Sequence, residues 1–206
     1  MKKIILLTSL LLLSLSVFAQ SKARFGLRAG ANISKLTNLD NKNKTDFYFG
    51  AILALKINES YTLQPEFTYS QQGGTLTENN FVLNEQNERL KDINIDFLSL
   101  AVINKIQANN NIHFLIGPFI DFRIDDNVNN DSYVLEGLFP RMDIGIMAGF
   151  GFDIMDNLSI EARFKHGFVD MINEHDIFIN ARTDDTNYNQ VFQLGIVYKF
   201  NTKTNK

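Results

Sequence analysis

Three histidines and a series of regularly spaced charges are the groups in this chain best suited to chemistry. His166 and His175 stand close to three acidic residues, Asp170, Glu174 and Asp176. Such a group could act in acid/base catalysis or bind a metal. It lacks the spacing of HExxH or of a paired-aspartate motif, so solvated polar residues of a loop are the favoured interpretation.

Charged residues also recur at every second position, as in Glu161, Arg163 and Lys165. Side chains that alternate in this way share one face of a β-strand. They could form a proton relay, line a channel, or pair as structural salt bridges, and the fold has to decide among these. The full set of charges on such faces is Arg28, Lys56, Glu66, Asp121, Arg123, Arg141, Asp143, Asp153, Glu161, Arg163, Lys165 and Lys199.

The segment 141–168 shows this alternation best and is predicted to be a hairpin. Phe, Ile and Met dominate one face, while charged residues and glycines occupy the other, and Asp156-Asn157 supplies a short turn. Either face of such a hairpin could lie outside, because a soluble antiparallel sheet also alternates.

Further strands are predicted at 24–34, 46–57, 61–73, 93–106, 111–124 and 190–200. The segment 93–106 is the least regular, because nearly every residue from Phe97 to Ile103 is apolar. Pro65 counts against the strand at 61–73, since it removes one ladder donor. In 111–124 the third histidine, His113, shares the polar face with Asp121, at the end away from His166.

Connections between these strands alternate in length. Long polar loops are expected at 35–45, 74–92, 125–137 and 169–189, and short turns at 58–60, 107–111 and 156–157. This alternation is typical of outer-membrane barrels. We therefore predict an all-β fold, an eight-stranded antiparallel up-and-down transmembrane β-barrel with its Phe and Ile face toward lipid. The alternative is a soluble two-sheet sandwich. Because eight strands leave little open bore, the barrel favours structural salt bridges over a relay or a channel.

The composition of the 206 residues narrows the class of protein further. Lys2, Lys3, an apolar core and Val17-Phe18-Ala19 predict a cleaved signal peptide at 1–19, followed by a single barrel domain at 20–206. The absence of Cys excludes disulfides and thiolate zinc sites. The net charge of -3 gives no indication of nucleic-acid binding. The runs 40–46 and 129–132 lack the ligand spacing of a calcium loop. No metal, cofactor or nucleic-acid partner is expected.

Several strand signatures occur in a fixed order along the chain. They are FGLRAGANIS at 25–34, LQPEFTYSQQGG at 63–74, FLSLAVINK at 97–105, HFLIGPFIDF at 113–122, DIGIMAGFGFDI at 143–154, LSIEARFKHGF at 158–168 and FQLGIVYKF at 192–200. In this order the chain resembles the PorT-like outer-membrane β-barrel proteins of Gram-negative bacteria. Ala101 stands where that family usually has a proline. The resemblance implies an eight-stranded barrel in the outer membrane and no assigned activity.

The function expected from the sequence is a structural, adhesive or partner-binding role through the external loops, without catalysis. Outer-membrane lipid and a protein at those loops are the expected partners. Aromatic residues near strand ends, such as Tyr69, Phe168 and Tyr198, fit the girdles found at membrane interfaces. The alternatives are a narrow porin-like channel for small solutes and a membrane-embedded hydrolase that uses His166 and His175.

Overall fold

The computed structural model describes residues 22–37, 41–76, 92–128, 139–171 and 186–201. In this part of the chain it has nine strands: β1 (Lys22–Leu36), β2 (Asn41–Lys42), β3 (Lys44–Lys56), β4 (Tyr61–Leu76), β5 (Asp92–Gln107), β6 (Ile112–Val128), β7 (Met142–Met155), β8 (Leu158–Gly167) and β9 (Asn189–Lys199). Only Asn43 separates β2 from β3, and both pair with β4, so the two form one interrupted strand. Among these residues no helix is long and apolar enough to cross a membrane.

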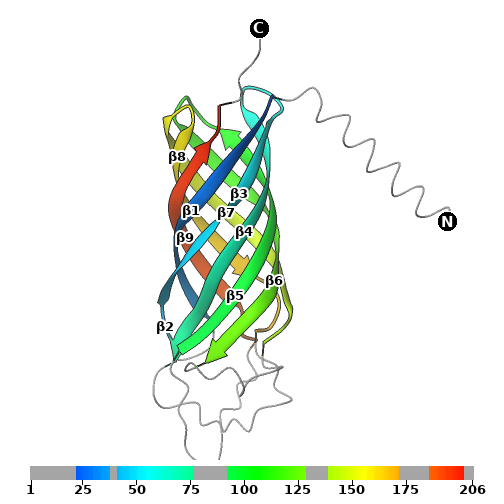
Figure 1. Ribbon diagram of the computed structural model, residues 1–206, viewed down its shortest axis with the longest axis vertical. Helices are drawn as coiled ribbons and strands as arrows, with labels where there is room; N and C mark the ends of the chain where they lie inside the picture. Colours follow the sequence, from blue (N-terminus) through cyan, green and yellow to red (C-terminus); the bar gives the residue numbers. More distant parts are fainter. Residues whose placement is uncertain (1–21, 38–40, 77–91, 129–138, 172–185, 202–206) are drawn as a thin grey trace, which may run out of the picture.

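The strands form a closed barrel (Figure 1). Each long strand pairs antiparallel with the next one in the chain, and β1 pairs with β9 to complete the circle. Closure leaves no sheet edge with unpaired backbone groups, as a strand in lipid requires. The predicted fold class, an eight-stranded antiparallel up-and-down barrel, is confirmed.

Tight turns join the strands at one end of the barrel, which we call the turn end. Asn58 Oδ1 accepts a hydrogen bond from the Ser60 amide at 2.9 Å, and Asn109 Oδ1 accepts one from the Ile112 amide at 2.8 Å. Such side-chain acceptors favour short turns. β1 begins and β9 ends at this same end, and the opposite end is the loop end (Figure 1).

The predicted bounds of the loops are wrong at several points. β1 continues to Leu36 and β3 begins at Lys44, inside the loop expected at 35–45. β4 likewise reaches Leu76, and β6 reaches Val128. Backbone pairing needs no apolar side chains, so the ladder continues past the point where the hydrophobic alternation stops. The remainders of these loops, at 38–40, 77–91, 129–138 and 172–185, lie outside the described residues.

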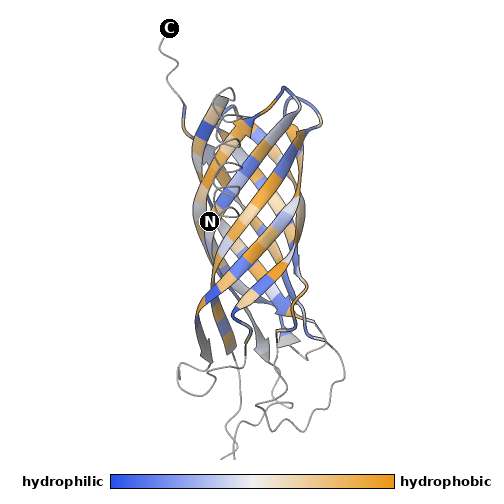
Figure 2. Cartoon of the chain, turned by 90° about the vertical axis from the view of Figure 1, so that its right-hand side faces the viewer, coloured by the Kyte–Doolittle hydropathy of each residue, from blue (hydrophilic) through white to orange (hydrophobic). Residues whose placement is uncertain are grey.

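The outer face of the barrel is apolar along the middle of the strands. Phe25 is 68% exposed and Phe150 is 60% exposed, and Figure 2 shows hydrophobic and hydrophilic residues alternating along each strand. Other large apolar side chains on this surface are Leu27, Phe49, Phe67, Leu100, Phe114, Ile146, Phe164, Phe192 and Ile196. An apolar belt of this kind needs lipid around it.

The lumen contains apolar as well as polar side chains. Ala101, Ile103, Leu115, Phe119 and Met147 form a buried cluster on β5, β6 and β7. β5 is therefore apolar on both faces, since its Leu100 and Val102 point outward. This explains why 93–106 showed no alternation in the sequence.

Glycine makes room for a bulky lumen side chain at Gly151. A Cβ at this position would lie 2.2 Å from His113 Nε2 and 2.9 Å from Glu161 Cγ. His113 is fully buried, so it has little space to move away. The absence of a side chain at Gly151 on β7 therefore lets the imidazole of His113 on β6 reach Glu161 on β8.

Candidate functional site

Glu66 lies at the centre of a buried ion-pair cluster in the lumen. Its carboxylate accepts hydrogen bonds from Arg163 Nη1 and Nη2, both at 2.8 Å, and from Gln64 Nε2 at 2.8 Å. Arg28 donates a further hydrogen bond to Glu66 Oε2. Arg163 also donates to Glu161 Oε2, from Nη2 at 2.6 Å and Nε at 3.1 Å. Two guanidinium groups and two carboxylates thus balance each other in charge.

Neutral amides on β9 and β1 extend this cluster from Arg28. Arg28 Nη2 donates to Gln193 Oε1 at 3.1 Å, and Gln193 Nε2 donates to Asn32 Oδ1 at 2.9 Å. Asn32 Nδ2 then donates to Ser70 Oγ at 2.9 Å. The Arg28 guanidinium also lies 4.6 Å from the centre of the Tyr48 ring. These bonds link the nearby strands β9, β1 and β4, whereas the hydrogen bonds between Arg163 on β8 and Glu66 on β4 connect opposite walls of the barrel.

His113 lies between two carboxylates on the turn-end side of this cluster. Its Nδ1 is 3.2 Å from Asp153 Oδ2, and its Nε2 is 3.3 Å from Glu161 Oε1. Asp153 also accepts hydrogen bonds from Gln107 at 3.0 Å and Ser159 at 2.5 Å. The imidazole thus joins the Asp153 carboxylate to the central ion pairs.

A second group of charges lies toward the loop end. Lys165 Nζ pairs with Asp121 and stands 4.1 Å from the centre of the Phe119 ring. Asp143 is the register partner of Asp121 on β7, and its Oδ1 accepts a hydrogen bond from the Val169 amide at 3.3 Å. Asp121, Asp143 and Lys165 are all buried.

These groups fill the bore. The gap lined by Arg28, Glu66, Ser99, Met147 and Lys165 has no room for a water-sized molecule. Buried charges are stable only where partners of opposite sign and hydrogen bonds surround them. Glu66, Glu161 and Arg163 meet this condition, and the chemistry of the centre of the lumen is that of a packed polar core.

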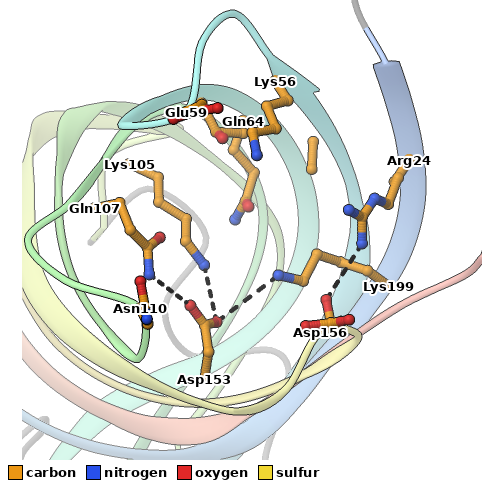
Figure 3. A pocket seen from close by; sticks show the side chains of 12 residues that line it. Arg24, Lys56, Glu59, Gln64, Lys105, Gln107, Asn110, Asp153, Asp156 and Lys199 are labelled. Carbon is orange, nitrogen blue, oxygen red and sulfur yellow. Dashed lines mark hydrogen bonds and ion pairs between the residues drawn. The ribbon is translucent and has the colours of Figure 1, made fainter.

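At its turn end the lumen opens into a cavity of about 590 Å³ (Figure 3). Strands β1, β3, β4, β5, β7 and β9 and the turns between them contribute its lining. Lys105 Nζ and Lys199 Nζ approach Asp153 Oδ1 in its wall, at 3.3 Å and 3.8 Å. The remaining lining residues are Arg24, Ala54, Lys56, Glu59, Thr62, Gln64, Gln107, Asn110 and Asp156.

The twelve charges singled out in the sequence divide between the lumen and its two ends. Arg28, Glu66, Asp121, Asp143, Asp153, Glu161, Arg163, Lys165 and Lys199 take the positions described above. Lys56 is exposed at the mouth of the turn-end cavity. Near the loop end Arg123 is half-buried and Arg141 is exposed. Strand periodicity predicts the face of a residue but not its depth in the barrel.

Two charged or titratable members of the lumen were absent from the predicted set, Lys105 and His113. His113 shares its face of β6 with Asp121, and this alternation could have indicated that His113 points into the lumen. Lys105 belongs to β5, where apolar residues on both faces hide the alternation.

The histidines of the predicted loop site are not brought into an acid/base group by the described structure. His166 lies beside the rings of Phe164, Phe168 and Tyr188 on the outer surface, with centroid distances of 6.4, 5.6 and 5.6 Å. Its Nδ1 is 3.4 Å from Gln190 Nε2. His175, Glu174 and Asp176 lie outside the described residues. Within the described ranges, no group of three or more His, Asp or Glu is placed to hold a metal ion.

Comparison with known proteins supports the same architecture. The chain is similar to Neisserial surface protein A, with a TM-score of 0.57 and 12% identity over 85% of this chain and 97% of that one. The structure of Ail of Yersinia pestis, solved with the heparin analogue sucrose octasulfate, has a TM-score of 0.48 and 15% identity, over 86% of this chain and 99% of that one. OprG of Pseudomonas aeruginosa has a TM-score of 0.46 and 12% identity, over 88% of this chain and 98% of that one. At these identities the likeness concerns the fold alone.

No curated protein matches the sequence of the chain. A protein-family model, however, matches residues 18–173, which is more than half of the chain. The model describes the outer membrane protein beta-barrel domain. Its match agrees with the closed barrel, the apolar outer belt and the polar lumen. The chain therefore belongs to the outer membrane protein beta-barrel domain family.

Proposed function

We propose that this protein is a non-conducting, non-catalytic outer-membrane barrel that holds external loops for a structural, adhesive or partner-binding role. One observation carries the proposal: the Glu66 cluster fills the bore with paired charges. A barrel whose lumen is a packed core is a rigid support. Recognition of a partner then depends on the connections at the loop end.

We assign a structural role to the charges in the lumen. Glu66 pairs with Arg28 and Arg163, and Arg163 also pairs with Glu161. The side chains of Glu66, Glu161 and Arg163 are at most 1% exposed. Groups held in this way are not accessible to a substrate. Lys56 and Arg141, which are exposed, contribute to the rims of the barrel.

Conductance in planar bilayers tests the closed lumen against the narrow channel. The purified barrel is expected to give no discrete, reproducible openings. A variant with both Glu66→Ala and Arg163→Ala removes the central side chains and should open a water-filled path, which provides the positive control. Openings of the unaltered protein that match those of this variant would contradict the proposal.

We also propose that no reaction takes place around His166 and His175. Support comes from His166, which lies among aromatic rings on the outer surface. If a hydrolytic activity toward lipid or peptide is found, a chain with His166→Ala and His175→Ala should retain it. Loss of that activity with the barrel still folded would favour the hydrolase.

We infer that residues 1–19 are a cleaved signal peptide and that the barrel lies in the outer membrane of a Gram-negative cell. Support comes from the n-region, the apolar core and the Val17-Phe18-Ala19 site. Mass spectrometry of the membrane-extracted protein should give a chain that begins at Gln20. A chain that still carries residues 1–19, or one that is soluble without detergent, would contradict this inference.

We further propose that the chain belongs to the PorT-like members of its family, supported by the order of the strand motifs from 25–34 to 192–200. This assignment carries no role in secretion. Co-purification from native membranes tests for a protein partner, and deletion of residues 77–91 should release a partner held by the loop predicted at 74–92.

A further inference from the structure

The turn-end cavity is the one described space in the barrel that is open, sizeable and polar. Its volume of about 590 Å³ lies within the range of small-molecule sites, which is roughly 300–1,000 Å³. Ala54 is the only apolar residue in its lining. Such a lining gives little stabilisation to an apolar ligand, but offers many hydrogen bonds to a hydrophilic one.

The cations of this cavity outnumber its anions. Arg24, Lys56, Lys105 and Lys199 face three carboxylates, Glu59, Asp153 and Asp156. Lys56, Glu59 and Asp156 are all exposed, so solvent weakens the effect of each of these charges. The less exposed cations Arg24, Lys105 and Lys199 then face one carboxylate, that of Asp153. In the wall of the cavity, Lys105 and Lys199 pair with the same carboxylate, Asp153 (Figure 3).

Asp153 has no spare capacity to neutralise these lysines further. Its two oxygens already accept from Gln107, Ser159 and Lys105, and lie beside His113 and Lys199. Each ammonium group carries three donors, and one carboxylate cannot use them all. The cavity therefore has surplus positive charge and surplus donors.

Lys56 adds to this surplus at the mouth. Among the described residues no hydrogen bond or ion pair of its side chain is found, and the residue is exposed. Arg24 Nη1 donates to the Asp156 backbone carbonyl at 3.3 Å, which leaves the guanidinium charge unneutralised by that contact. Gln64, Gln107 and Asn110 bring neutral amides to the same space.

We propose that the turn-end cavity binds a small hydrophilic anion that carries carboxylate or phosphate groups. Lysine ammonium groups bind either group as point charges. The buried His113, Glu161 and Arg163 close the inner end, so the anion enters and leaves by the turn end. This end faces the periplasm by the general arrangement of short turns in outer-membrane barrels.

The test is calorimetric titration of the folded full-length mature barrel in zwitterionic detergent, with citrate in one series and inorganic phosphate in the other. Lys56→Gln and Lys199→Gln each remove one cation from the cavity. Either change should weaken binding on the order of tenfold, as expected for one charge contact at a partly solvated site. Lys42→Gln removes the same charge from an exposed position in β2, near the loop end, and should leave the affinity unchanged.

Two further measurements keep the test independent of misfolding. Lys199→Arg keeps the charge and should retain binding within a few-fold, and heat-modifiable gel migration reports that each variant is folded. The side-chain amide NMR signals of Gln107 and Asn110 should shift with the same saturation as the heat signal. Those of Gln72, which hydrogen-bonds to Asp121 toward the loop end, should not shift.

Saturable binding of citrate alone identifies a carboxylate ligand, and binding of phosphate alone identifies a phosphate ligand. Absence of saturable binding by both anions overturns the proposal. Equal weakening by Lys42→Gln, or no weakening by Lys56→Gln and Lys199→Gln, also overturns it, because the anion would then bind elsewhere. The conductance of the barrel is a separate measurement, so this site and the closed lumen can fail independently.

Discussion

Replacement of Glu66 by glutamine is expected to destabilise the barrel strongly. Oε2 accepts from Arg28 and Arg163, and Oε1 accepts from Arg163 and Gln64. Whichever oxygen becomes an NH₂ group in Glu66→Gln loses two donors and faces a guanidinium. Two hydrogen bonds to charged groups are worth about 3–6 kcal/mol together. Loss of one partner from a buried ion pair costs about 3–5 kcal/mol. The free energy of unfolding should therefore fall by about 3–5 kcal/mol.

Urea unfolding in lipid vesicles, followed by gel migration of the folded and unfolded forms, measures this loss. Glu59→Gln makes the same chemical change at an exposed turn and should alter stability by less than about 0.5 kcal/mol. Arg163→Gln alone should also be costly. Combined with Glu66→Gln it should cost less than the sum, because each single change leaves the other charge unpaired. A loss below about 1 kcal/mol, or strict additivity, would refute the reasoning.

Two further changes test the outer face and the narrow lumen. Ala148→Arg places a charge on the outward face at the middle of β7 and should lower the free energy of unfolding in vesicles by about 2–4 kcal/mol. The control Asn157→Arg, in the turn, should leave that free energy unchanged. Equal effects of the two variants would contradict a lipid-facing belt. Gly151→Ala places a Cβ 2.2 Å from His113 Nε2 and should cost about 1–3 kcal/mol in urea unfolding. His113→Ala in the same chain should recover part of that loss, and no recovery would exclude this clash as the cause.

The barrel could be predicted because each strand needs two different surroundings. Residues such as Glu161, Arg163 and Lys165 cannot face lipid, and Ile160 and Phe164 between them gain by facing it. This conflict is visible in the order of residues alone. The alternation of long and short connections then fixed the up-and-down order of the strands.

The partners inside the lumen could not be predicted in the same way. Glu66 and Arg163 are 97 residues apart, and their meeting depends on the tilt and stagger of all the strands. Strand periodicity indicates that both point inward, but not that they stand at the same height. The same limit applies to Lys56 and Arg141, which share the inward face but lie at the ends of the barrel, in contact with solvent.

The cluster around Glu66 also has a consequence for biogenesis. Arg28 comes from β1, Glu66 from β4 and Arg163 from β8, so no single hairpin can assemble it. In a half-built sheet Arg28 can reach Glu66 within β1–β4, and Arg163 can reach Glu161 along β8. Glu66 and Arg163 meet only when pairing of β1 with β9 closes the ring. Contacts between such distant segments make folding slow and cooperative. Seam closure and formation of the Glu66–Arg163 ion pair are thus one event, which favours the complete ring over every open intermediate.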